Sequence, residues 1–164
     1  MNDALLRPLI GLVLKRGVGL GGLPTAQQTE VFALAWAGLP DGGATERQIN
    51  EQLKSQLAGA LSFLDTDHVE LRRWLVDAGW LRRDGYGREY RRVPWAQLPE
   101  AGQALAAALA SLEVASWVAG HRAAHEAQRQ ARHQAWAAQQ AGGTGQASQA
   151  SMAEQASRWQ VNKP

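Results

Sequence analysis

The stretch Asp67–Val93, DHVELRRWLVDAGWLRRDGYGREYRRV, decides the fold that the sequence predicts. Its first part carries apolar residues at helical spacing, with Asp67 as a typical N-cap and Gly79 where a helix usually ends. Its second part predicts two strands joined by the turn Asp84–Gly87, because both glycines of this turn tolerate positive φ. A helix followed by such a hairpin is the second half of a winged helix.

Two further helices are predicted upstream of this stretch. Thr25 and Thr45 each precede a glutamine by three residues, which is the spacing of a capping box, and apolar residues follow both at helical spacing. The order helix, helix, helix, hairpin predicts a mainly α fold with a small β-hairpin, a winged helix-turn-helix core with an N-terminal helix and a long C-terminal helix. Two strands alone are marginal, so the hairpin must pack on the helices. The expected members of the shared core are Trp74, Trp80, Leu81 and Tyr90.

The winged helix is predicted to have extensions on both sides. The expected parts are 1–24, an amphipathic helix and a glycine-rich link; 25–93, the winged helix; 94–140, an alanine-rich helical arm; and 141–164, a flexible tail. The apolar stripe of the arm extends to Val118. This stripe favours either a homodimer formed through the N- and C-terminal helices or packing of the arm on residues 3–16 of the same chain. Trp159 in the tail is a candidate anchor for a protein partner.

Composition favours a binding protein over several other classes. The net charge is only +2, so any basic surface must be local, and the absence of cysteine excludes disulfides and thiolate metal sites. No apolar run approaches ~18 residues, and the first residues lack a signal-peptide pattern, so we expect a cytoplasmic protein without membrane contact. No catalytic motif is apparent, so we expect neither an enzyme nor a cofactor. His121 and His125 have zinc-ligand spacing, but no further ligands complete a site, and we expect no metal.

Two motifs resemble those of a known family. Residues 45–53, TERQINEQL, resemble YTE-[RK]-x-[VI]-N-x-x-L, and residues 71–83, LRRWLVDAGWLRR, resemble LRR-x-LVD-x-G-x-L-x-R, with YRR at 90–92 for Y-x-R. Together they are similar to a bacterial domain family of unknown function, found in small hypothetical proteins and candidate transcriptional regulators. The similarity covers roughly residues 23–93, with Ala44 in place of a frequent aromatic residue and residues 54–66 loosely matched. It implies a winged-helix-like fold and a role in transcription regulation, but no catalytic residue and no ligand.

Double-stranded DNA is the first candidate partner, because seven of the 17 Lys and Arg residues lie in the stretch 67–93. In a DNA-binding winged helix, the third helix enters the major groove and the wing contacts the backbone or the minor groove. The fork of Arg73 suits guanine, and the N-terminus of the preceding helix suits phosphate. The predicted nucleic-acid-binding residues are Thr45, Arg47, His68, Arg73, Arg82, Arg88 and Arg91.

The remaining arginines are predicted to hold the fold together. Asp77 lies near a helix C-terminus, where the macrodipole disfavours a negative charge, so it needs a cationic partner. Alternation along the second strand puts Tyr90 and Arg92 on the inner face and Arg91 on the outer face. The predicted structural ion pairs are formed by Arg72, Asp77, Arg83 and Arg92. Two functions follow: a DNA-binding regulator with its recognition helix at 67–78 and its wing at 80–93, or a scaffold module that uses the same fold for assembly.

Overall fold

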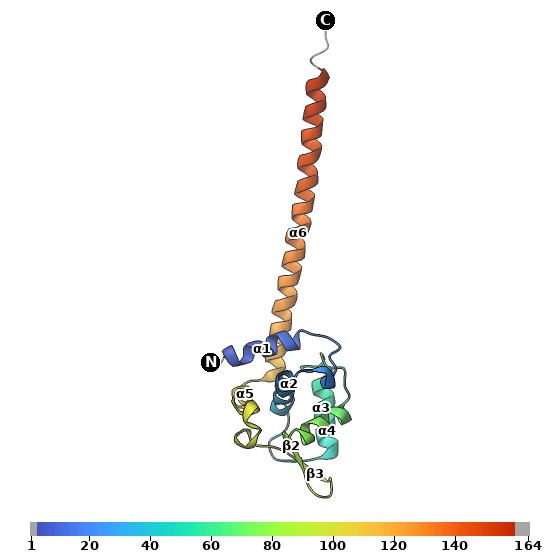
Figure 1. The fold of residues 1–164 in the computed structure, drawn as a ribbon. Helices are drawn as coiled ribbons and strands as arrows, with labels where there is room; N and C mark the ends of the chain where they lie inside the picture. Colours follow the sequence, from blue (N-terminus) through green and yellow to red (C-terminus); the bar gives the residue numbers. More distant parts are fainter. Residues whose placement is uncertain (1–2, 160–164) are drawn as a thin grey trace. The chain divides into compact units, whose positions relative to one another are not determined.

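The structure is a computed structural model that describes residues 3–159, with side chains for residues 3–143. Its described part is mainly helical with one small antiparallel sheet, as predicted (Figure 1). The chain forms two compact units, one up to Arg122 and one from Ala123 onward, and each is described by itself. The elements are α1 (Asp3–Val13), η1 (Leu20–Gly22), α2 (Thr25–Ala37), β1 (Gly43–Thr45), α3 (Glu46–Ala58), α4 (His68–Asp77), β2 (Leu81–Arg83), β3 (Glu89–Arg92), η2 (Trp95–Gln97), α5 (Glu100–Ala110) and α6 (Val114–Trp159).

The middle of the chain has the element order of a winged helix, α2, β1, α3, α4, β2 and β3. The sheet order is β1-β3-β2, so β3 pairs with both neighbours, and Tyr90 lies opposite Ala44 on one side and Arg83 on the other. The sequence did not predict β1, because a strand of three residues that begins with glycine resembles a turn. A Cβ at Gly43 would lie 2.3 Å from the Glu89 carboxylate, so a larger residue there would displace the flexible Glu89 side chain.

One hydrophobic core joins the helices and the hairpin of the first unit. Trp80, Leu81 and Tyr90 are fully buried, and Trp74 packs against the core, so the predicted shared core is confirmed. The buried Trp36 of α2 also contributes, because its indole Nε1 donates a hydrogen bond of 2.7 Å to the carbonyl of Val93 just after β3. A buried indole thus finds its polar partner at the end of the hairpin and fixes the hairpin on α2.

Only one of the two predicted capping boxes forms. Thr45 and Gln48 exchange both bonds at the start of α3, with the Gln48 amide donating to Thr45 Oγ1 over 3.2 Å and the Thr45 amide donating to Gln48 Oε1 over 2.8 Å. At α2 the helix already begins at Thr25, so Thr25 is inside the helix and cannot cap it. Gln28 instead donates to the carbonyl of Leu20, at 3.2 Å, and joins α2 to η1.

Asp67 caps α4 as predicted. Its carboxylate accepts hydrogen bonds of 2.8 Å from the backbone amides of Glu70 and Val69. The bond from Glu70, followed by that from Val69, lowers the pKa of the Asp67 carboxyl below its ordinary value, despite some opposing desolvation. The cap therefore favours the ionised carboxylate at the helix N-terminus.

The cap of α4 makes stability depend on pH. A carboxyl with a depressed folded-state pKa contributes stability above its unfolded pKa and loses it as pH falls through the folded pKa. Asp67→Ala is therefore expected to lower the urea midpoint at pH 7, with a difference from wild type that shrinks below about pH 4. Asp65→Ala, which removes an exposed aspartate that caps no helix, is the control and should show no such trend. A constant difference for Asp67→Ala from pH 7 to pH 2 would contradict the charged cap.

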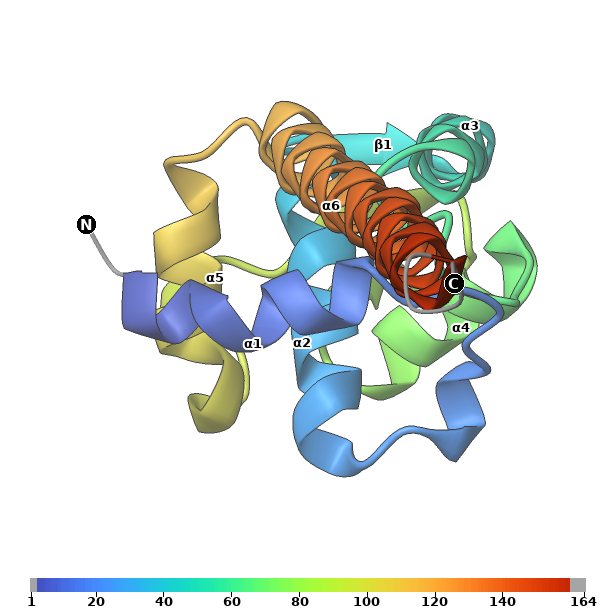
Figure 2. The same cartoon turned by 90° about the horizontal axis from the view of Figure 1, so that it is seen from above.

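The N-terminal helix packs on the rest of its unit. α1 ends at Val13, three residues earlier than predicted, and its buried residues are Leu6, Leu9, Leu12 and Val13. The buried face is therefore rotated from the predicted one, and Leu5 is 42% exposed. α1 lies against α5 (Figure 2). Since Pro8 lies inside this helix and removes one backbone donor, packing of its apolar face is what maintains it.

The alanine-rich arm is not one continuous helix. It begins with η2, continues as α5, and α6 starts only at Val114. α5 packs on α2 and α1, so its apolar stripe is covered within the chain. This agrees with the expectation that the arm packs on the N-terminal helix of the same chain. Gly102 permits this packing, because a Cβ there would lie 2.4 Å from the ring of Trp80. A homodimer through the terminal helices remains a prediction.

α6 continues where the sequence predicts a flexible tail. Its backbone is helical to Trp159, so residues 141–159 have regular structure despite their glycines. The many Ala and Gln residues of this stretch favour a helix. The flexibility of the tail stays a prediction, and the side chain of Trp159, the candidate anchor, lies outside the described residues. In the described chain no single helix has the length and hydropathy to cross a membrane; α5 and the first part of α6 meet those criteria only as a pair bent by 85°.

Arg122 fixes the first turns of α6 to the domain. Its guanidinium donates to three backbone carbonyls, those of Val13 (3.1 Å), Gly59 (2.9 Å) and Ala60 (3.1 Å). Val13 is the last residue of α1, and the other two directly follow α3. A cation at two helix C-termini is favourable, because both expose carbonyl groups that lack partners. No local pattern around Arg122 indicates this role.

Candidate nucleic-acid interface

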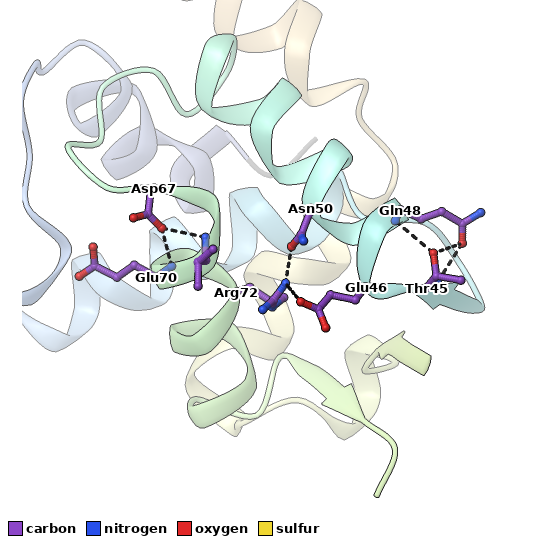
Figure 3. A network of polar contacts seen from close by, with 8 residues as sticks. Thr45, Glu46, Gln48, Asn50, Asp67, Glu70 and Arg72 are labelled. Atoms are coloured by element: carbon purple, nitrogen blue, oxygen red, sulfur yellow. Dashed lines mark hydrogen bonds and ion pairs between the residues drawn. The ribbon is translucent and has the colours of Figure 1, made fainter. Parts of the chain in front are cut away.

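The two sequence motifs meet at Arg72. Its guanidinium forms an ion pair of 2.9 Å with Glu46 and donates a hydrogen bond to the side chain of Asn50 (Figure 3). It also lies 5.5 Å from the ring centre of Tyr90. Glu46 and Asn50 come from the first motif, and Arg72 and Tyr90 come from the second. The Arg72 side chain is only 12% exposed, so this cluster joins α3, α4 and β3 from within.

Arg92 has the corresponding role on the other side of the hairpin. It forms an ion pair with Asp41 and donates a hydrogen bond of 3.3 Å to the carbonyl of Trp36. Its guanidinium also lies 4.2 Å from the ring centre of Trp36, which is a favourable cation–π distance. Burial lowers the pKa of Arg92 from its ordinary value, but an arginine stays charged at neutral pH. Tyr90 and Arg92 thus face inward and Arg91 outward, as the strand alternation predicts.

The predicted partner of these arginines is wrong. Arg72 and Arg92 are structural, but they pair with Glu46 and Asp41, and no ion pair between described side chains involves Asp77. Asp77 is five residues beyond Arg72, about 140° further around α4, so the two side chains leave the helix on different sides. Arg83, the third predicted partner, is exposed and likewise forms no ion pair in the described part of the chain.

A groove of about 950 Å³ separates α4 from the wing, which is the hairpin of β2, β3 and their turn. α4 forms one wall, β2 and the turn form the second, and residues 97–99 form the third. The groove is lined by Arg72, Arg73, Val76, Asp77, Gly79, Leu81, Arg82, Arg83, Asp84, Gly85, Tyr90, Gln97, Leu98 and Pro99. The candidate site therefore combines residues of the second motif with a segment that follows the winged helix.

Three arginines of the groove have no anionic partner among the described residues. Arg73, Arg82 and Arg83 are exposed, and no described hydrogen bond or ion pair engages their side chains. Of the two carboxylates in the groove, that of Asp84 accepts a hydrogen bond of 2.8 Å from the backbone amide of Arg88 and stabilises the turn. These three guanidinium groups can bind an anion without first breaking a bond within the protein.

The other predicted nucleic-acid-binding residues do not line this groove. The hydroxyl of Thr45 is part of the α3 capping box, and Arg47 lines a separate hollow of about 450 Å³ beside β1. His68 is half-buried at the start of α4. Arg91 is exposed and forms an ion pair of 2.6 Å with Glu89. The fifth, Arg88, is at the end of the wing turn, with its guanidinium 5.9 Å from the ring centre of the exposed Tyr86.

The winged-helix domain has no excess of positive charge. Residues 25–93 contain nine Lys and Arg residues and ten Asp and Glu residues. A long-range positive field is therefore absent from this domain, and binding of a polyanion has to depend on short-range contacts made by the groove arginines.

Sequence reasoning missed the acidic and polar partners of the structural arginines. Glu46 and Asn50 are four residues apart, so they share one face of α3, and both are letters of the first motif. That spacing was a usable signal for a common partner. Asp41 lies in a predicted turn and offered none. Among the side chains that the structure describes, no group of three or more His, Asp and Glu residues is placed to hold a metal ion.

Comparison with known proteins supports the resemblance carried by the two motifs. Residues 24–92 match the model of a family described as an uncharacterized protein conserved in bacteria, DUF2087. The matched region runs from the residue before α2 to the last residue of β3, which is the winged-helix part of the chain. The chain has no match among curated proteins and none among solved structures.

Proposed function

We propose that residues 24–92, the region similar to the uncharacterized bacterial family, form a DNA-binding regulatory module that acts in transcription. The observation that carries this proposal is the groove between α4 and the wing, where Arg73, Arg82 and Arg83 are exposed and unpaired within the described structure. The function is binding without catalysis, and we place it in the cytoplasm.

The roles of the three arginines follow from their positions. Arg73 is on α4, the helix that corresponds to a recognition helix, and its fork suits the O6 and N7 acceptors of guanine in the major groove. Arg82 and Arg83 are on the wing strand β2 and suit phosphate oxygens. This division supports a DNA-binding mode in which α4 contacts the base edges and the wing holds the DNA backbone in position.

The affinity of one copy is expected to be modest. Three free arginines give few phosphate contacts, and the domain as a whole has no excess of positive charge. We therefore expect dissociation constants in the micromolar range at low salt. A homodimer through the N- and C-terminal helices would bring two such surfaces to one DNA and raise the affinity.

Double substitution of the groove arginines tests the proposal. Arg73→Ala/Arg82→Ala is expected to weaken binding to mixed-sequence duplex DNA by roughly 10- to 100-fold at low salt, because two charge-assisted contacts are lost. Fluorescence anisotropy with a labelled duplex measures this.

The matched control is Arg7→Ala/Arg129→Ala, which removes two exposed arginines from α1 and α6 and keeps the net charge equal. It should bind within about twofold of wild type if contacts and not net charge carry the affinity. Two results together would favour the scaffold function. The wild-type chain would fail to bind duplex at micromolar concentration and low salt, and the groove substitutions would affect only association with a protein.

A further inference from the structure

The groove beside α4 has a third wall that a helix and a wing alone do not provide. This wall consists of Gln97, the last residue of η2, and of Leu98 and Pro99, which connect η2 to α5; all three lie outside the region that resembles the bacterial family. They convert an open surface into a groove of about 950 Å³. This volume is near the upper end for sites that enclose small molecules, so it suits a few nucleotides of one strand.

The groove is amphipathic. Its walls carry Arg73, Arg82 and Arg83, whereas Leu81 and Tyr90 are buried residues that form part of its floor. A duplex presents phosphates and sugars outward and stacks the faces of its bases inside. A single strand exposes both its charged backbone and the apolar faces of its bases. Leu81 and Tyr90 are almost fully buried, so the apolar surface open to a base includes the half-buried Val76 and the exposed Pro99. The combination of arginines with this apolar surface therefore matches one strand better than two.

Two exposed aromatic residues are close in sequence to residues that line the groove. Tyr86 is 86% exposed and directly follows Gly85, which lines the groove. Trp95 is 49% exposed and belongs to the same short helix, η2, as Gln97, which lines the opposite wall. Neither side chain is part of the hydrophobic core. Neither residue lines the groove itself, but each is within two residues of one that does. Exposed aromatic residues next to a positively charged groove favour single-strand binding, because every base can stack on them.

We infer that the groove takes a single strand of nucleic acid, with Tyr86 and Trp95 as stacking residues, so that the preferred ligand is DNA with an unpaired segment. This inference rests on the proposed function, since the same arginines bind the phosphates. It adds the class of ligand: an opened or single-stranded region next to the recognition helix, and not an intact duplex alone.

Three DNA ligands of one sequence test the inference. They are an intact duplex, the same duplex with an internal unpaired bubble, and one isolated strand, each labelled for anisotropy. The wild-type chain is expected to bind the bubble and the isolated strand roughly 5- to 100-fold more tightly than the intact duplex, which is the effect of about one stacked base. Stacking should also quench tryptophan fluorescence when the bubble is added.

Aromatic variants identify the residues that cause the preference. Tyr86→Ala and Trp95→Ala should each remove most of the difference between bubble and duplex, and Trp95→Phe should restore part of it. Trp136→Ala is the matched control, because Trp136 is a comparably exposed tryptophan on α6, at 59%, and should leave the preference unchanged. Tyr86 is in an exposed turn, so its removal tests the inference even if Trp95→Ala reduces folding.

The outcomes separate the inference from the proposed function. Equal affinity for the three ligands, or a preference that survives both alanine variants, overturns the single-strand inference and leaves duplex binding in place. Absence of binding to all three ligands at low salt overturns the proposed function and the inference with it.

Discussion

Arg72→Ala is expected to lower the free energy of unfolding by about 2–3 kcal/mol. The substitution removes the ion pair with Glu46, the hydrogen bond to Asn50 and the contact with the ring of Tyr90, from a side chain that is only 12% exposed. It also leaves two polar groups of α3 without a partner. Urea unfolding followed by tryptophan fluorescence measures the change, because Trp36 and Trp80 are buried in the core.

The neighbouring arginine provides the control. Arg73→Ala removes an exposed guanidinium from the next position of α4, and its effect on unfolding should stay within about 0.5 kcal/mol. Arg72→Lys should recover only part of the loss, since an ammonium group cannot reproduce the planar fork. Equal losses for Arg72→Ala and Arg73→Ala would show that the cluster of Figure 3 does not stabilise the domain.

Gly102→Ala is expected to destabilise the chain by about 1–3 kcal/mol, although alanine is normally the better helix former. A Cβ at this position would lie 2.4 and 2.5 Å from two ring carbons of Trp80, which is itself buried and cannot move away freely. The unfolding midpoint in urea measures the effect. The substitution tests whether α5, which lies beyond the family match, is an integral part of the winged-helix core.

Gly120→Ala is the matched glycine substitution. Gly120 is also helical, but nothing lies within 4 Å of a Cβ built there. This change should stabilise the chain by up to about 1 kcal/mol, because it removes the entropic cost of glycine in a helix. A neutral or stabilising result for Gly102→Ala would mean that α5 does not pack on Trp80 as the structure has it.

The local patterns of the sequence predicted the winged helix well. The spacing of apolar residues and the cap at Asp67 place α4, and period-two alternation places Tyr90 and Arg92 inside and Arg91 outside. Each of these features depends on residues that are near one another in the chain. β1 escaped prediction, because its three residues form a strand only when β3 supplies the hydrogen bonds.

Partners that are distant in sequence could not be predicted in the same way. Asp77 was the predicted partner because it lies at the C-terminal end of α4, where a negative charge is disfavoured, but the packing of α3 on α4 brings Glu46 to Arg72 instead. Arg83 was therefore grouped with the structural arginines, whereas it is exposed in the groove. The same limit applies to α5, whose alanine-rich sequence does not reveal that Gly102 meets Trp80.

The division of the arginines explains why the motif is recognisable and where a ligand can bind. Arg72 connects α3, α4 and the hairpin, and Arg92 connects the hairpin to α2. Both therefore serve the fold of this chain, whatever it binds. Among the described arginines that line the groove, only Arg73, Arg82 and Arg83 have side chains that form no ion pair or hydrogen bond. The proposed regulatory function therefore depends on these three side chains and not on the basic character of the whole motif.

The salt dependence of DNA binding tests this division most directly. The logarithm of the binding constant is measured against the logarithm of salt concentration for the wild-type chain and for Arg82→Ala/Arg83→Ala. If these two arginines bind phosphates, the magnitude of the slope is lower by about two for the variant, and its folding stability is unchanged. An unchanged slope in a folded variant would contradict the claim that the groove arginines bind the DNA backbone.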